Sequence, residues 1–120
     1  MINFQVQLFP SDWKVDVWIG KEIEEAISDL SIIYGESPKY WFEALQVPGF
    51  VESKLWNIKH EENMILLYLE DFTEKVIVHE INHVIHHFGR IIGMTWDYDN
   101  QELQSIYHEW LFDEIMKRKQ

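Results

Sequence analysis

The segment TEKVIVHEINHVIHHFGRIIG, residues 73 to 93, decides how the rest of the chain is organised. Its apolar residues recur at intervals of three and four, which predicts an amphipathic α-helix with one face turned toward a core. Those residues are Ile77, Ile81, Val84, Ile85, Phe88 and Ile92. Thr73 is a residue type that caps helix starts, and Gly93 is one that ends helices. We therefore expect one helix from Thr73 to Gly93 with its apolar face buried.

Histidines gather on the opposite side of this expected helix. At about 100° per residue, His83 and His86 fall within about 40° of His79. Glu80 lies about 100° round from His79, at the border between the polar and apolar faces. Its carboxylate can therefore be partly removed from water and still lean over a metal ion held by its neighbours.

His79, Glu80 and His83 spell the motif H-E-x-x-H. On a helix this spacing sets two imidazoles one turn apart, where they can bind Zn²⁺ while the glutamate takes a proton from a metal-bound water. The motif therefore predicts His79 and His83 as metal ligands, Glu80 as general base, and a zinc-dependent hydrolase. The alternative is an ordinary polar outer face on an amphipathic helix.

The residues that follow the motif resemble a known group of enzymes. Eighteen residues separate His83 from Glu102. H-E-x-x-H, eighteen residues and a glutamate resemble the gluzincin branch of the zincin metallopeptidases, in which that glutamate comes from the next helix. Catalytic zinc usually has three protein ligands and one open position for water. The resemblance thus implies Glu102 as the third ligand, at the start of a helix expected from Asn100 to Lys119.

Glu102 also has a second interpretation. Asp99 and Glu102 have the spacing of a capping box, in which Glu102 would reach back to the start of the helix. The apolar face of that helix is expected to contain Leu103, Ile106, Tyr107, Trp110 and Leu111. If Glu102 caps the helix, then Asp97, Asp99, His108 or Glu109 would have to replace it as a ligand.

A wider resemblance covers roughly residues 64 to 116. The order strand, H-E-x-x-H helix, glycine, acidic loop and N-Q-E before an aromatic-rich helix looks like the short zincin-like proteins of phages and prophages. The resemblance implies a minimal zincin-like α+β fold, Zn²⁺ and metallopeptidase activity. Thermolysin-like enzymes place an aspartate four residues after the third ligand, where this chain has Ile106. The metzincin pattern disagrees at His86 and Gly89.

The first half of the chain carries none of these motifs. Alternation predicts strands at residues 2–9 and 13–19, and helical spacing predicts a helix over residues 21–33. Residues 40–50 are aromatic without a clear period, so they form either a packed loop or short helical turn, or a hydrophobic lip for substrate. Residues 51–59 and 63–70 are expected to form a hairpin turning at residues 60–62. The expected sheet is small and antiparallel or mixed.

Composition limits the function further. The 120 residues suit a single domain, and the 47% hydrophobic content indicates a folded core. A net charge of −11 argues against nucleic acids and anionic membranes as partners and favours a peptide or protein that is neutral or basic. The absence of cysteine excludes disulfides and thiolate-bound zinc. With no signal peptide or membrane span evident, we expect a cytoplasmic protein, in a host cell or a virion if it is phage-encoded.

Other residues have supporting roles in these hypotheses. An oxyanion stabiliser should face the metal, and Tyr98, Tyr107 and His108 are the candidates. His86 lies one turn beyond His83, which places it in the surroundings of the metal or on the plain surface. In zincins a sheet edge beside the cleft adds an extended peptide as a strand, so residues 64–69 or their partner strand are expected to supply that edge.

Three functions remain open at this point. The first is a zinc peptidase. The second is a catalytically inactive phage protein that uses zinc for stability and acts by binding or assembly. The third is a metal-free interaction module whose histidines are only surface residues.

Overall fold

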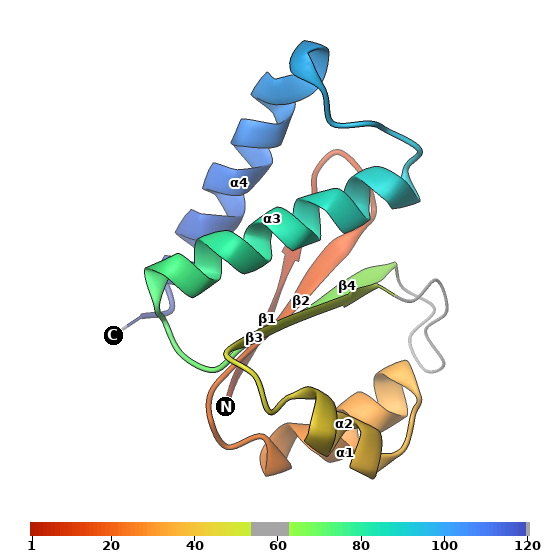
Figure 1. Ribbon diagram of the computed structural model, residues 1–120, viewed down its shortest axis with the longest axis vertical. Coiled ribbons are helices and arrows are strands. Elements are labelled where there is room, and N and C mark those ends of the chain that lie inside the picture. Colours follow the sequence, from red (N-terminus) through yellow and green to blue (C-terminus); the bar gives the residue numbers. More distant parts are fainter. Residues whose placement is uncertain (54–62, 120) are drawn as a thin grey trace.

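A four-stranded mixed sheet forms the centre of the computed structural model, which describes residues 1–53 and 63–119 (Figure 1). The strands are β1 (Ile2–Gln7), β2 (Lys14–Ile19), β3 (Gly49–Ser53) and β4 (Met64–Leu69). Their order in the sheet is β1-β2-β4-β3, with β2 parallel to β4 and the two outer pairs antiparallel. The central strands are therefore β2 and β4, and β3 is an edge strand.

Helices cover both faces of this sheet (Figure 1). On one face lie α1 (Glu24–Tyr34) and α2 (Pro38–Ala44). On the other lie α3 (Glu74–Ile91) and α4 (Gln101–Met116), which follows the short 3₁₀ helix η1 (Tyr98–Asn100). The expected α+β class and mixed sheet are confirmed. No helix in the described part of the chain combines the length and apolarity that a membrane crossing requires.

Residue patterns explain why the strands occupy these positions. Every residue of β4 is buried, as expected for a central strand with helices on both faces. Successive side chains alternate between faces, so Ile65 and Leu67 join the core under α3 and α4, whereas Leu66 joins the core over α1 and α2. In β1, only Phe4 and Val6 are buried, which matches an edge strand with one wet face.

The first-half expectations hold with shifted ends. The strands expected at 2–9 and 13–19 are β1 and β2, and the helix expected at 21–33 is α1. Residues 40–50 are divided between α2, a turn and the start of β3, so the short-helix interpretation is confirmed for the first part of this segment. Ser37 caps α2 by accepting a hydrogen bond from the Tyr40 amide at 3.2 Å. The expected antiparallel partner of β4 is β3, whereas the expected turn at residues 60–62 lies outside the described residues.

The helix α3 matches the expected amphipathic helix with two corrections. Thr73 is its N-cap residue, but the Thr73 side chain makes no capping hydrogen bond. Ile92 is 41% exposed, because α3 ends at Ile91 and the apolar face ends with it. Gly93 ends the helix as expected: its φ of 71° allows the Met94 amide to bond back to the Gly89 carbonyl at 2.8 Å.

The apolar face of α4 is narrower than expected. Tyr107, Leu111 and Ile115 are buried at intervals of four, whereas Ile106 and Trp110 are about half exposed. The rings of Tyr107 and Phe88 meet edge to face, with centroids 5.5 Å apart, and this contact packs α4 against α3. The face predicted from the sequence was therefore wrong for Ile106 and Trp110.

Candidate metal centre

The two histidines of the motif lie on the exposed side of α3 and point toward one another. Their Nε2 atoms are 3.2 Å apart. Two nitrogens bound to one tetrahedral zinc at about 2.0–2.1 Å each would be about 3.3–3.4 Å apart. The helix thus already holds His79 and His83 at nearly the separation that a shared zinc ion requires.

Glu80 is buried beside this pair. It is 8% exposed, and its Oε1 atom lies 3.9 Å from Nε2 of His79. The possible ligand atoms of His79, Glu80 and His83 all lie within 4.8 Å of one another, and this is the one such group of three or more in the described residues. No described residue donates a hydrogen bond to the Glu80 carboxylate. Neither oxygen of Glu80 is a fully enclosed atom without a partner, so the carboxylate stays open to solvent or to a ligand.

Gly49, at the start of β3, creates the space that Glu80 occupies. A Cβ atom at Gly49 would lie 2.5 Å from Cγ and 2.9 Å from Cδ of Glu80, which are not possible contact distances. The Glu80 side chain therefore packs directly against the backbone of the edge strand. Sequence reasoning missed this role, and the only local signal was the Pro48-Gly49 pair ahead of a strand.

A hollow of about 290 Å³ opens where α3 meets β3. It is lined by Pro48, Gly49, Lys75, Val76, His79 and Glu80. The sequence did not single out Lys75, although its position one turn before His79 on the same helix could have suggested it. Glu80 and His79 thus line one hollow beside the edge strand.

Glu102 is not part of the group around His79 and His83. It is exposed in the first turn of α4, which begins away from the middle of α3 (Figure 1). Its alternative interpretation, a capping box with Asp99, is wrong. The box is formed two residues earlier: the Asp97 side chain accepts from the Asp99 amide at 3.0 Å, and the Asp97 amide donates to Asn100 Oδ1 at 2.8 Å. The Glu102 carboxylate thus takes no part in the cap.

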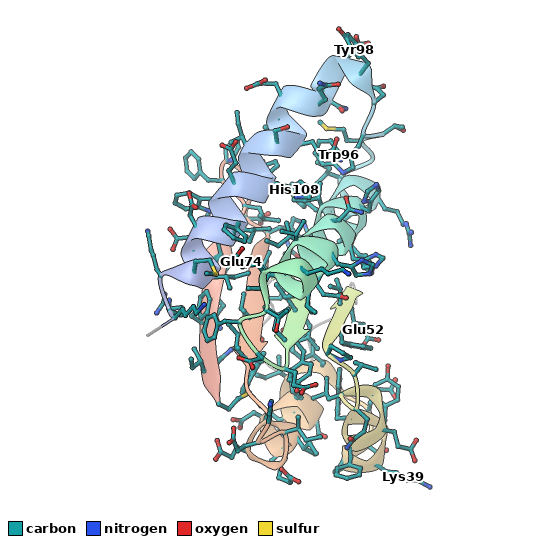
Figure 2. The ribbon with its side chains drawn as sticks, turned by 60° about the vertical axis from the view of Figure 1, so that its left-hand side comes forward. Lys39, Glu52, Glu74, Trp96, Tyr98 and His108 are labelled. Carbon is teal, nitrogen blue, oxygen red and sulfur yellow. The ribbon has the colours of Figure 1, made fainter. Side chains whose placement is uncertain are left out.

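The oxyanion candidates lie in three different environments. Tyr98 is 85% exposed at the far end of α4 (Figure 2). Tyr107 is buried, and its hydroxyl donates to the Phe9 carbonyl at 3.1 Å, away from the histidines; burial raises its pKa. His108 is half-buried between α4 and α3, and burial, followed by the nearby His86, lowers its pKa. Among the three, only His108 lies beside α3 with a free polar atom.

The other histidines of α3 flank the pair. His86 is exposed, and its Nδ1 lies 2.7 Å from the Asn82 carbonyl, a bond that holds the ring against its own helix. Burial lowers the pKa of His87, and Arg90, His83 and His86 lower it further. The group of possible ligands does not include either residue. The two expectations for His86, a place in the surroundings of the metal or on the plain surface, both stay predictions.

The connection between the two helices is fixed close to the end of α3. The Trp96 indole (Figure 2) donates to the Ile85 carbonyl at 2.6 Å and lies against Gly89, where a side chain would collide with it. The glycine inside α3 therefore allows the loop to fold back on the helix, which sets where α4 begins.

No family model, curated protein or solved structure matches this chain. The case for a function therefore depends on the side chains themselves.

Proposed function

We propose that this protein is a zinc-dependent hydrolase that cleaves peptide bonds, with His79 and His83 as metal ligands and Glu80 as general base. The observation that carries the proposal is that the mostly buried Glu80 carboxylate, which has no donor among the described residues, lies beside two imidazoles whose Nε2 atoms are 3.2 Å apart.

The proposed mechanism uses Glu80 twice. A zinc ion held by His79 and His83 would supply a Lewis acid for the substrate carbonyl and a water whose pKa is lowered toward about 7. Glu80 would accept the proton that the attacking water gives up. Glu80 then delivers the proton to the leaving nitrogen as the carbon–nitrogen bond breaks.

The edge strand β3 offers a place for a peptide. The Glu70 amide donates to the Pro48 carbonyl at 2.9 Å, which fixes the alternation of the β3–β4 ladder. By that alternation Gly49 and Val51 turn their amide and carbonyl groups away from β4. These groups have no hydrogen bond to any described residue. An extended peptide can therefore add to β3 as a strand, next to Glu80.

Glu102 is proposed as the third ligand. Its carboxylate is exposed and takes no part in the cap, and the proposal rests on its spacing of eighteen residues from His83. His108 and Glu109 on the same helix are the substitutes. Metal affinity measured for Glu102→Gln against Glu109→Gln would identify the ligand, because loss of a ligand weakens binding far more than loss of a surface charge.

A zinc-stabilised binding protein is the second candidate; if it is phage-encoded, it would act in a host cytoplasm or a virion. It is favoured by the position of Glu102, since no described histidine or acidic residue besides Glu80 joins the two histidines, and by exposed Ile106, where thermolysin-like enzymes have an orienting aspartate. It predicts zinc binding and stabilisation with no turnover.

A cleavage screen separates the two candidates. Purified protein, loaded with zinc or treated with chelator, would be incubated with a diverse peptide library, and products would be identified by mass spectrometry. The peptidase predicts cleavage that stops with chelator and returns with zinc. Loss of folding on chelation with no cleavage in either state would select the binding protein.

A further inference from the structure

A second hollow lies on the other flank of the metal pair. It measures about 490 Å³ and is lined by Val78 and Ile81 from α3 and by His108, Glu109, Phe112 and Asp113 from α4. Figure 2 shows His108 on the side of α4 that faces α3. The walls of the hollow therefore come from two helices that pack against each other.

Helix geometry places this hollow next to the proposed catalytic group. Val78 directly precedes His79, whereas Glu80 directly follows it. At about 100° per residue, these neighbours point to opposite flanks of the histidine. The hollow with Glu80 therefore lies on the β3 flank, and the hollow with Val78 lies on the α4 flank. A substrate whose carbonyl reaches the metal would have side chains close to both.

The walls of the second hollow combine apolar surface with negative charge. Val78 is 51% exposed, and Phe112 is partly exposed. Glu109 and Asp113 lie one helical turn apart, and both are exposed. Neither carboxylate forms a hydrogen bond or ion pair with any described residue.

We propose that this hollow is a specificity site for a lysine or arginine side chain of the substrate, an inference that rests on the proposed peptidase function. The methylene stem would lie on Val78 and Phe112, and the cationic end would reach Glu109 and Asp113. The net charge of −11 would attract the same basic peptides over longer range.

The test is a charge-matched comparison. Two peptide series would differ only in lysine or its uncharged analogue norleucine at each position around the cleaved bond. The double variant Glu109→Gln/Asp113→Asn removes both carboxylates. The control Glu24→Gln/Asp29→Asn makes the same change in net charge on α1, which is on the other face of the sheet.

The wild type and the control are expected to cleave the best lysine peptide faster than its norleucine counterpart, with a ratio of kcat/KM of about fivefold, as for a partly exposed ion pair. The double variant is expected to lose that ratio, which is compared within each variant and does not depend on its absolute rate. Equal rates on both series in the wild type, or a ratio that the control loses as well, would overturn the specificity site and leave the peptidase standing.

A binding measurement keeps the two proposals separable. Zinc-loaded Glu80→Gln protein would be titrated with the same peptides and followed by NMR at the amides of Val78 and Phe112. Peptide binding that depends on lysine and on the two carboxylates, without cleavage by the wild type, would support the hollow and contradict the peptidase. Absence of both binding and cleavage would contradict both.

Discussion

Two carboxylates are buried in the described part of this protein, and they lie on opposite sides of the sheet. Asp16 on β2 is 1% exposed and faces α1. Glu80 on α3 is 8% exposed and faces β3. Both side chains have the same charge and similar burial, so the difference between them lies in the groups that surround each one.

Asp16 is saturated with donors. Its Oδ1 accepts from Asn3 at 2.9 Å and from Gln5 at 3.2 Å, and its Oδ2 accepts from Trp18 at 3.0 Å and from Tyr34 at 2.6 Å. These bonds join β1, β2 and α1, which gives the carboxylate a structural role. A buried carboxylate whose oxygens are already hydrogen-bonded has no acceptor site left for a ligand.

Glu80 has no such donors among the described residues. Its Oε1 atom lies 3.9 Å from Nε2 of His79, and its side chain lines the hollow beside β3. The same residue type is therefore used for architecture on one side of the sheet and, as we propose, for catalysis on the other. The number of hydrogen bonds that each carboxylate accepts distinguishes the structural role from the proposed catalytic role better than burial does.

The largest expected effect is on turnover in the Glu80→Gln variant. Loss of the base should lower kcat by about 10²–10⁴-fold while zinc stays bound, because both imidazoles remain. The check is kcat on the best peptide from the library screen, with zinc content measured on the same sample. Normal turnover by Glu80→Gln would contradict the assignment of the base.

Next in size is the stability of the Asp16→Asn variant. Asparagine replaces one carboxylate oxygen with an NH₂ group, which cannot accept the hydrogen bonds of the donors around it. The free energy of unfolding should therefore fall by about 3 kcal/mol. Glu80→Gln breaks no hydrogen bond to a described residue, so it should change the free energy of unfolding by less than about 0.5 kcal/mol. Urea denaturation of both variants in the presence of chelator measures the contrast. Equal losses would remove the distinction between the two carboxylates.

A smaller effect is expected for Gly49→Ala. The added methyl group must displace Cγ of Glu80, so turnover should fall by about tenfold, as for a misplaced catalytic group. Ser53→Ala on the same strand is the control, since it adds no atom beside Glu80. If Gly49→Ala retained full turnover with the Glu80 side chain displaced in a crystal structure, the position of this carboxylate would not matter.

The smallest expected effect is on pH dependence, through Tyr34. Burial raises the pKa of Tyr34 well above its ordinary value of 10, and the charge and hydrogen bond of Asp16 raise it further. Because the unfolded chain releases this proton near pH 10 and the folded chain does not, the stability is complete below pH 10 and falls as the pH rises above it. Urea unfolding at pH 9 and pH 11 should therefore show a smaller decline for Tyr34→Phe than for the wild type. Tyr98→Phe, which changes an exposed tyrosine, should decline like the wild type.

Local pattern predicted α3 and its histidines, because the spacing within one helix determines which side chains share a face. Contacts between distant segments were not predictable in this way. Nothing near Gly49 in the sequence indicates that Glu80 packs on it, and nothing near Asp16 indicates its four donors. The cap at Asp97 and Asn100 was missed because the chain enters α4 through a 3₁₀ turn, which moves the box away from Asp99 and Glu102.

The order of the strands in the sheet could not be predicted from the sequence either. The strand pattern predicted β3 beside β4, but it carried no information that β2 would lie parallel to β4 on the other side. That arrangement makes β4 a central strand and β3 an edge strand, beside Glu80. The sequence had offered both strands as the edge that binds a peptide, and β3 is the one that lies at an edge.

Metal content tests the central claim most directly. Untagged protein should be dialysed against zinc and then against zinc-free buffer, and its metal measured by elemental analysis together with that of Glu80→Gln and of His79→Ala/His83→Ala. We predict about one zinc per chain for the wild type and for Glu80→Gln, and none for the double histidine variant. Wild-type protein without zinc, or equal zinc in the double histidine variant, would contradict a metal centre at His79 and His83.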